Sequence, residues 1–453
     1  MSDLLTIILA AGKGTRMKSK KNKVLHKIAG KKMINHVVDT AENISSDEVI
    51  CVVGHQAESV KQAVSSKSIK FKLQSKQLGT AHAVFQAGKE IKDHKGDVLI
   101  LYADIPLIKQ STLNQMLNHH HDNFADLTIM TSILKNPNGY GRIVKDNSSK
   151  IIKIVEHKDT DENEKSIKEI NSGIMCVDSK ILDDALNNID NNNEQQEYYL
   201  TDIVSYINGK DGRVISYQTE DPVEITGVND RIALSKAEKK MRKRINERHM
   251  ANGVTIIDPA TTYIDESVEI GLDTIIYPFT YIEGDTEIGV NNMIKPHNHI
   301  INCKIGKNNI IINSNLIKNS KIGDECQIGP FAHIRPGCNL KNGVKIGDYV
   351  ELKKADINVG TKVPHLAYVG DAEIGKKTNI GAGTIFANYD GVNKNKTIVG
   401  NSVFIGSNST LVAPLTIRDN GKTGAGSVVT KDVEENTTVL GVPAREYVKK
   451  KDD

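Results

Sequence analysis

The sequence has few cysteines, few aromatic residues and no large excess of charge of either sign. Its five cysteines form no C-x-x-C pair, which argues against a disulfide scaffold or a zinc ribbon and fits a reducing cytosol. Aromatic residues make up 4% of the chain and the net charge is +3, with no cationic block interleaved with aromatics. We therefore expect no nucleic acid partner.

Long apolar runs are missing as well. No stretch approaches the ~20 apolar residues that a membrane-spanning helix requires, so we expect no membrane partner. The apolar start LLTIILAAG is similar to the core of a signal peptide, but Asp3 lies where a signal peptide carries positive charge, and no cleavage site follows. We predict that this run is a buried strand and that the protein is cytoplasmic.

The length predicts two domains, because 453 residues exceed what one hydrophobic core usually supports. In the first half, strand-like runs such as EVICVVG and DVLILYAD alternate with helical patterns. This alternation predicts a Rossmann-like α/β domain with a mostly parallel sheet, which we place at residues 1–228. Ligands of such sheets bind beyond the carboxyl ends of the strands, where LAAGKGTRM and YADIPL lie.

The second half has a different period. Residues 229–250 have the apolar spacing of one helix, which we expect to link the two halves. Residues 251–453 repeat a six-residue unit, in which an aliphatic residue and a glycine precede four variable positions. Three such units close one coil of about 18 residues in a parallel β-helix. The stretch Leu352–Tyr368 breaks this period, and we expect it to form a loop on one face.

The segment LAAGKGTRM is a glycine-rich loop that follows the first predicted strand. It is not a Walker A motif, because Lys13 lies between Gly12 and Gly14, and it is not a complete G-x-G-x-x-G. Backbone N–H groups of such a turn can bind an anion, with Arg16 and Lys23 as cations for a polyphosphate. An ordinary strand-to-helix turn is the alternative that the loop alone leaves open.

Polar residues farther along the chain favour a nucleotide site. Asp104 directly follows a buried strand, where an acid either caps a helix or binds a metal. Asn229 offers an amide oxygen to the same Mg²⁺, and Gln74 suits a base edge. Thr80 also suits a base edge, or serves only as the N-cap of a helix. Sugar hydroxyls are expected at Gly141, Glu156 and Asn171.

These motifs, with others in the second half, carry a family resemblance. LAAGKGTRM, QLGTAHA, GYGRI and GVNDR, followed by VELKKA, HLAYVGDAEIG and NIGAGTIFANYDG, resemble the bacterial bifunctional N-acetylglucosamine-1-phosphate uridyltransferases and glucosamine-1-phosphate N-acetyltransferases. The resemblance covers the full chain and implies a left-handed β-helix, Mg²⁺ at Asp104 and Asn229, and a homotrimer. It implies UDP-sugar or UTP contacts at Leu9, Ala10, Ala11, Gly12, Lys23, Gln74, Gly79, Thr80, Gly141, Glu156, Asn171 and Asn229.

The same resemblance implies a second site on the β-helix. His365 would take a proton from an amine as that amine attacks a thioester, although a lone histidine in a loop is more often a plain surface residue. The acetyl acceptor is implied to contact Arg335, Lys353, Tyr368 and Asn379. Acetyl-coenzyme A is implied to contact Ala382, Asn388, Tyr389, Ser407, Ala425 and Arg445.

Three segments stand outside this assignment. Ala103 lies where the family has glycine, and its methyl group could crowd the nucleotide or the sugar. Gln196 begins a QEYY segment where the family has GEYY. The run His119–His121 is assigned no role, because consecutive side chains on a helix point in different directions.

We predict a bifunctional enzyme of UDP-N-acetylglucosamine synthesis for the cell wall. It would acetylate glucosamine 1-phosphate with acetyl-coenzyme A and then transfer UMP from UTP to the product, releasing pyrophosphate. A nucleotidyltransferase with a purely structural β-helix is the alternative. A third reading is a regulatory or assembly protein that has lost catalysis, and the joint presence of Arg16, Lys23, Asp104, Asn229 and His365 argues against it.

Overall fold

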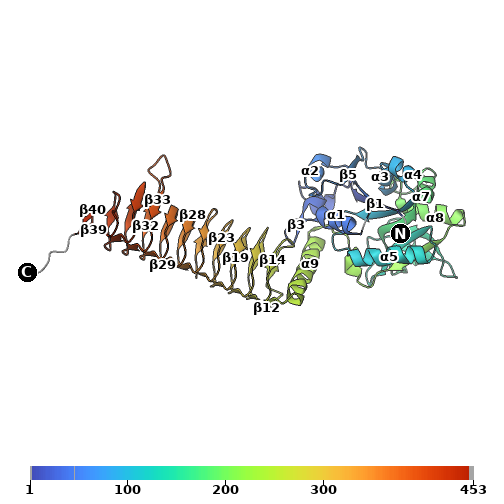
Figure 1. The fold of residues 1–453 in the computed structure, drawn as a ribbon. Helices are drawn as coiled ribbons and strands as arrows, with labels where there is room; N and C mark the ends of the chain where they lie inside the picture. The colour runs from blue at the N-terminus through green and yellow to red at the C-terminus, as the bar shows by residue number, and fades with distance from the viewer. Residues whose placement is uncertain (1–2, 45, 448–453) are drawn as a thin grey trace, which may run out of the picture. The chain divides into compact units, whose positions relative to one another are not determined.

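The computed structural model describes residues 3–44 and 46–447. The chain divides into two compact units between Lys239 and Lys240, within helix α9 (Arg231–Ala251). The first unit is an α/β fold, and the second is a stack of short strands (Figure 1). Within the described ranges, no helix is both long enough and apolar enough to cross a membrane.

A nine-stranded sheet forms the centre of the first unit. Its strands are β1 (Asp3–Ala10), β4 (Glu48–Val53), β5 (Lys70–Leu73), β6 (Gly96–Tyr102), β7 (Leu127–Ile133), β8 (Arg142–Lys145), β9 (Ile151–Val155), β10 (Glu169–Asp178) and β11 (Val214–Gln218). The main path runs β11-β7-β10-β6-β1-β4-β5. Strand β10 is antiparallel to its neighbours, whereas β1 pairs in parallel with β4 and β6. The sheet is therefore mostly parallel, as the sequence predicts.

Two apolar clusters bury the two faces of this sheet. Leu4 and Ile8 of β1 belong to one cluster, and Leu5 and Ile7 to the other, because successive strand residues point to opposite faces. This double burial explains why β1 is an uninterrupted apolar run. The helices are α1 (Met33–Asn43), α2 (Ala57–Lys61), α3 (Thr80–Phe85), α4 (Gly88–Asp93), α5 (Gln110–Asp122), α6 (Glu162–Ser166), α7 (Ser179–Leu186) and α8 (Ile203–Gly209).

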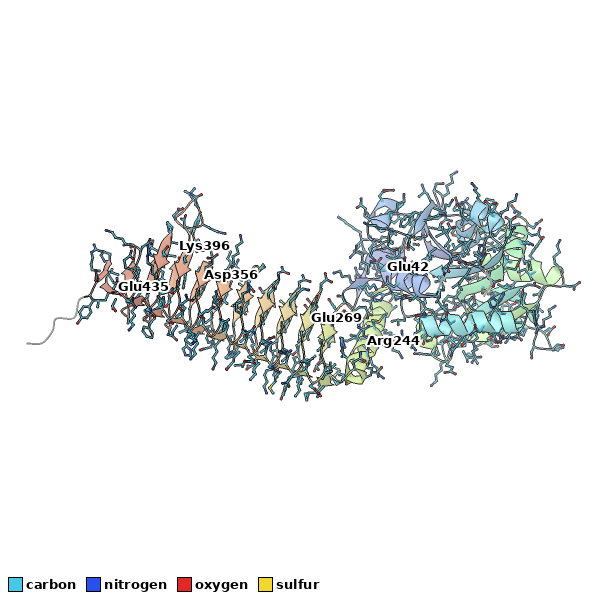
Figure 2. The ribbon with its side chains drawn as sticks, in the orientation of Figure 1. Glu42, Arg244, Glu269, Asp356, Lys396 and Glu435 are labelled. Atoms are coloured by element: carbon cyan, nitrogen blue, oxygen red, sulfur yellow. The ribbon has the colours of Figure 1, made fainter. Side chains whose placement is uncertain are left out.

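The second unit is a parallel β-helix, built as the six-residue period predicts. Stacked strands include β15 (Ile275–Ile276), β18 (Met293–Ile294), β21 (Ile310–Ile311), β24 (Gln327–Ile328) and β27 (Lys345–Asp348). Ile276, Ile294, Ile311, Ile328 and Ile346 pair in register along this column, and all are buried. Each isoleucine therefore packs against the coils before and after it, while charged side chains such as Glu269 and Asp356 lie outside (Figure 2).

The predicted loop at Leu352–Tyr368 is wrong. These residues stay within the coils as β28 (Glu351–Ile357), β29 (Lys362–His365) and the start of β30 (Tyr368–Ile374). Glu351 pairs with Tyr368, so this coil is 17 residues long, one residue shorter than three six-residue units. The difference is absorbed at a corner, and the strands keep their register. The chain leaves the coils at residues 388–396, between β32 (Ile385–Ala387) and β33 (Thr397–Val399), where Figure 1 shows a projecting loop.

Candidate active sites

The glycine-rich loop connects β1 to a short 3-10 helix, η1 (Thr15–Met17). Gly14 has a φ of +61°, and a Cβ added there would lie 2.6 Å from Cβ of Lys23. A side chain at this position is therefore strained and also blocked, and glycine lets the loop approach the helix η2 (Lys23–Leu25).

This loop borders a cavity of about 490 Å³ at the carboxyl ends of β1 and β6. The start of α3 supplies another part of the lining. The lining includes nine of the predicted site residues, namely Leu9, Ala10, Ala11, Gly12, Lys23, Gln74, Gly79, Thr80 and Asp104. It also includes Lys13, Gln77, Tyr102 and Glu197, which the sequence analysis did not assign to a site. Distant segments thus converge at the sheet edge that the sequence indicates.

A cationic side chain lies between the two predicted metal ligands. Nζ of Lys23 donates to Oδ2 of Asp104 at 2.5 Å and to Oδ1 of Asn229 at 3.0 Å. The N–H of Val228 donates to the carbonyl oxygen of Asp104 at 2.8 Å, which holds the GVND segment beside the end of β6. The donor set, a carboxylate and an amide oxygen around one cation position, fits Mg²⁺.

The neighbouring polar groups are fixed by backbone contacts. Nε2 of Gln74 lies 3.0 Å from the carbonyl oxygen of Gly79 and 2.9 Å from Nδ1 of His82. Thr80 is the first residue of α3 and not its N-cap, which is Gly79, so the capping interpretation is wrong. The hydroxyl of Thr80 accepts a hydrogen bond from the N–H of Leu200 at 3.0 Å, which ties α3 to the segment after QEYY.

The three residues predicted to hold a sugar lie together. The N–H of Asn171 donates to the carbonyl oxygen of Gly141 at 2.9 Å, and a Cβ on Gly141 would lie 3.6 Å from Oε1 of Glu156. Burial raises the pKa of Glu156, and a hydrogen bond from Thr201 opposes this shift. None of the three predicted residues lines the 490 Å³ cavity. Tyr102 lines the cavity and is near both groups: burial raises the pKa of its phenol, and the charges of Glu156 and Asp104 raise it further.

Arg16 and Ala103 do not line the cavity either. Arg16 is exposed on η1. Ala103 is fully buried in the apolar cluster that also holds Ile105, and its N–H donates to the carbonyl oxygen of Leu9 at 3.0 Å. The methyl group therefore packs in the core, which argues against the expectation that it crowds a bound ligand.

On the β-helix, His365 is the last residue of β29 and is paired with an acid on the coil before it. Asp348 ends β27 and is in register with His365, and Nδ1 of the imidazole hydrogen-bonds to Oδ1 of Asp348. This hydrogen bond lowers the pKa of Asp348, so its carboxylate stays ionised. An ionised carboxylate only accepts hydrogen bonds, so Nδ1 carries the proton and Nε2 is left as the basic nitrogen.

Cationic side chains gather one column away. Arg335 donates to Glu351 at 2.7 Å, and both lie near Tyr368, which is in register with Glu351. Lys353 lies against Lys394 of the projecting loop, and this neighbouring ammonium lowers the pKa of Lys394. Lys394 was not found from the sequence, because an inserted loop carries no period that would place it.

Three of the predicted coenzyme residues, Ala382, Ser407 and Ala425, lie along one corner of the coils that follow His365 toward the C-terminus. The N–H of Gly383 donates to the carbonyl oxygen of His365, and that of Asn408 donates to Ala382 one coil farther. The N–H of Gly426 continues the series to Ser407, so Ser407 and Ala425 lie on the next two coils. Asn388 is held by Asp371 at 2.5 Å. The remaining predicted residues are placed as follows: Asn379 in β31 (Asn379–Ile380), Tyr389 exposed on the projecting loop and Arg445 in β40 (Ala444–Glu446).

Asp348 is a site residue that the sequence analysis missed. It precedes His365 by 17 residues, which is one coil of this β-helix, so the coil length was the signal that could have found it. Tyr102 had a signal too, because it ends the strand that leads to Asp104.

Comparisons with known proteins match both halves of the chain. Residues 5–222 match the nucleotidyl transferase family, and residues 319–354 match the bacterial transferase hexapeptide family of six repeats. A Listeria monocytogenes protein named Bifunctional protein GlmU is 48% identical over 98% of this chain and 96% of its own length. The proteins of the same name from Listeria welshimeri and Acetivibrio thermocellus are 48% and 46% identical over 100% and 97% of this chain, and 98% and 95% of their own lengths.

A relative that is nearly half identical over almost the whole chain leaves no part of either unit unmatched. The two family matches fall on the two units in chain order. The chain belongs to the GlmU family of bifunctional enzymes, with a nucleotidyltransferase unit followed by a hexapeptide-repeat β-helix.

Proposed function

We propose that the β-helix acetylates glucosamine 1-phosphate with acetyl-coenzyme A and that the first unit then couples the product to UTP. The observation that carries this proposal is that one chain holds two separate sites of the required chemistry. One is the Lys23, Asp104 and Asn229 cluster at a glycine-rich loop, and the other is the His365–Asp348 pair.

In the first site, a phosphate oxygen of the sugar 1-phosphate attacks the α-phosphorus of UTP, and pyrophosphate leaves. The attacking phosphate is already ionised, so no general base is needed. The loop N–H groups and Lys23 hold the phosphates, and Arg16 adds positive charge from the rim. Asp104 and Asn229 would hold Mg²⁺, which neutralises phosphate charge when bound.

We assign the remaining contacts of this site by chemistry. The amide group of Gln74 lies at Gly79 and Thr80, where it can read the base edge of uracil. Glu156, Asn171 and the backbone at Gly141 supply acceptors and donors for sugar hydroxyls. Leu9, Ala10, Ala11 and Gly12 form the wall against the nucleotide.

In the second site, Nε2 of His365 takes a proton from the amine of glucosamine 1-phosphate as the nitrogen attacks the thioester carbon. The new C–N bond forms, the C–S bond breaks, and the coenzyme leaves as a thiolate that takes up a proton. Asp348 holds the imidazole with Nε2 toward the amine. Arg335 and Lys353 would bind the sugar phosphate, with Tyr368 and Asn379 beside the sugar.

Acetyl-coenzyme A would lie along the corner formed by Ala382, Ser407 and Ala425. Asn388 and Tyr389 border it from the projecting loop, and Arg445 would bind a coenzyme phosphate. We further propose a cytoplasmic homotrimer and functional boundaries at residues 1–228, 229–250 and 251–453.

A nucleotidyltransferase with a merely structural β-helix is the second candidate, and the His365–Asp348 pair argues against it. Assaying the purified chain for release of coenzyme A and of pyrophosphate separates the two. We expect release of coenzyme A when glucosamine 1-phosphate is supplied and release of pyrophosphate when N-acetylglucosamine 1-phosphate is supplied. Pyrophosphate release without any acetyl transfer would contradict the bifunctional proposal.

A further inference from the structure

A second group of metal-ligating side chains lies at the other end of β6 from the cavity. Asp97 is the second residue of β6, whereas Asp104 follows its last residue. At ~3.3 Å per strand residue, the two acids are about 20 Å apart. The group at Asp97 is therefore separate from the nucleotide cavity.

Three buried side chains of different chemistry converge there. A carboxylate oxygen of Asp97, a ring nitrogen of His120 and the sulfur of Cys176 all lie within 4.8 Å of one another. Their exposed fractions are 7%, 2% and 0%. Among residues 3–44 and 46–447, this is the one group of three His, Cys, Asp or Glu side chains that meets this spacing.

Strand register and helix geometry bring these residues together. Cys176 on β10 pairs with Leu99 of β6, two residues from Asp97 and on the same face of the sheet, while His120 lies in the last turn of α5. Nε2 of His120 is 3.5 Å from Oδ1 of Asp97, and its Nδ1 lies 2.8 Å from the hydroxyl of Thr128. The contact with Thr128 orients the ring with Nε2 toward the cluster, as partners behind metal-binding histidines do.

Two residues of the histidine run thus meet one carboxylate. Nε2 of His121 lies 2.6 Å from Oδ2 of Asp97, so His121 holds the oxygen that His120 does not face. His119 points elsewhere and contacts the ring of Tyr217. The last turn of a helix carries partial negative charge, which also favours a cation at this position.

We propose that Asp97, His120 and Cys176 bind a zinc ion that ties the end of α5 to strands β6 and β10. Sulfur, imidazole and carboxylate ligands together suit Zn²⁺, whereas Mg²⁺ prefers oxygen ligands alone. The cation enters past the neighbouring His121, whose side chain is partly exposed, and the thiol proton of Cys176 passes to the buffer. Cys176 then binds as a thiolate.

Cobalt(II) added to the metal-free full-length chain, with excess Mg²⁺ present, tests this directly. Co²⁺ accepts the ligands of Zn²⁺ and gives a thiolate-to-metal charge-transfer band when it binds sulfur. We expect one equivalent of Co²⁺ to produce the band and Zn²⁺ to abolish it. A folded chain that shows no such band would overturn the proposal.

Variants assign the band to these residues. Cys176→Ser and His120→Asn should each abolish it, whereas Cys51→Ser and His119→Asn should retain it. Cys51 is a matched control because it is an equally buried thiol outside the group, and His119 belongs to the same histidine run. A band that persists in Cys176→Ser would contradict the assignment.

A measurement without any variant covers the case in which a ligand change prevents folding. X-ray absorption of the zinc-loaded chain should show one sulfur neighbour at about 2.3 Å beside nitrogen and oxygen neighbours at about 2.0–2.2 Å. A shell of nitrogen and oxygen alone would overturn the site. Zinc should also raise the melting temperature, and binding without that rise would contradict the structural role.

Discussion

At the scale of single residues, the carboxylate of Asp348 is the feature that would let a surface histidine act as the proposed base. Asp348 would act through the imidazole of His365, so we treat it as a positioning residue. We expect His365→Ala to lower acetyl transfer by about 10²–10⁴-fold, the usual cost of removing a general base. Asp348→Asn should lower kcat by less, while KM for acetyl-coenzyme A stays unchanged.

The pH dependence follows from the same pair. The hydrogen bond from His365 lowers the pKa of Asp348, so the pair is intact above the ordinary pKa of an aspartate and is lost only as the pH falls through the lowered value. Asp348 therefore stays charged at neutral pH. Asp356 is an exposed acid of β28, so Asp356→Asn is the control for Asp348→Asn. Equal kcat values for these two variants would exclude a role for Asp348.

Lys23 would compete with the proposed metal ion for Asp104 and Asn229, because its ammonium contacts both oxygens. We expect Lys23→Ala to bind Mg²⁺ or Mn²⁺ more tightly in the absence of nucleotide, and yet to transfer uridylyl groups more slowly, since a phosphate contact is lost. Calorimetric titration measures the first effect. Asp104→Asn should lower the affinity for Mg²⁺ or Mn²⁺, and a higher affinity in that variant would contradict the assignment of Asp104 as a ligand.

Ala103 tests whether a departure from the family pattern has a cost. Its methyl group is buried in the core, so Ala103→Gly should leave KM for UTP unchanged and lower the free energy of unfolding by about 1 kcal/mol. Denaturant unfolding and initial-rate kinetics measure the two quantities. A lower KM in the glycine variant would show that the methyl group does reach the nucleotide.

At the scale of elements, the projecting loop at residues 388–396 brings Lys394 to Lys353. Two ammonium groups this close repel each other, which lowers the pKa of Lys394, and a bound phosphate would relieve the repulsion. We expect Lys394→Gln to raise KM for glucosamine 1-phosphate several-fold with little change in kcat. Lys396→Gln is the matched control, because Lys396, which Figure 2 labels, lies on the same loop but forms an ion pair with Glu373.

The sequence predicts regular elements better than it predicts their exceptions. The apolar run of β1 and the isoleucine columns follow from burial and period, so both units could be predicted. The coil at His365 is predicted as a loop because Leu352–Tyr368 carries no Ile-Gly pair of the repeat, although its 17-residue length is shared by regular coils such as the one from Ile294 to Ile311. The cluster at Asp97 also escaped prediction, since it depends on β10 lying antiparallel beside β6, a pairing that no local motif encodes.

At the scale of the whole molecule, the two sites belong to different compact units of one chain. The acetylated product of the β-helix is therefore expected to leave into solvent before it reaches the first unit. His365→Ala should lose acetyl transfer alone, and Asp104→Asn should lose uridylyl transfer alone. Each variant keeps one half-reaction, so the pair can test how the intermediate travels.

Mixing the two variant proteins with glucosamine 1-phosphate, acetyl-coenzyme A, UTP and Mg²⁺ should restore UDP-N-acetylglucosamine after a lag. The lag arises because free N-acetylglucosamine 1-phosphate must accumulate before the first unit can use it, and it should shorten as the Asp104→Asn protein is increased. Chromatography follows the intermediate and the product. If each variant keeps its own half-reaction but the mixture forms no product, the intermediate does not pass through solvent, and product from the His365→Ala protein alone would instead remove His365 from its role as base.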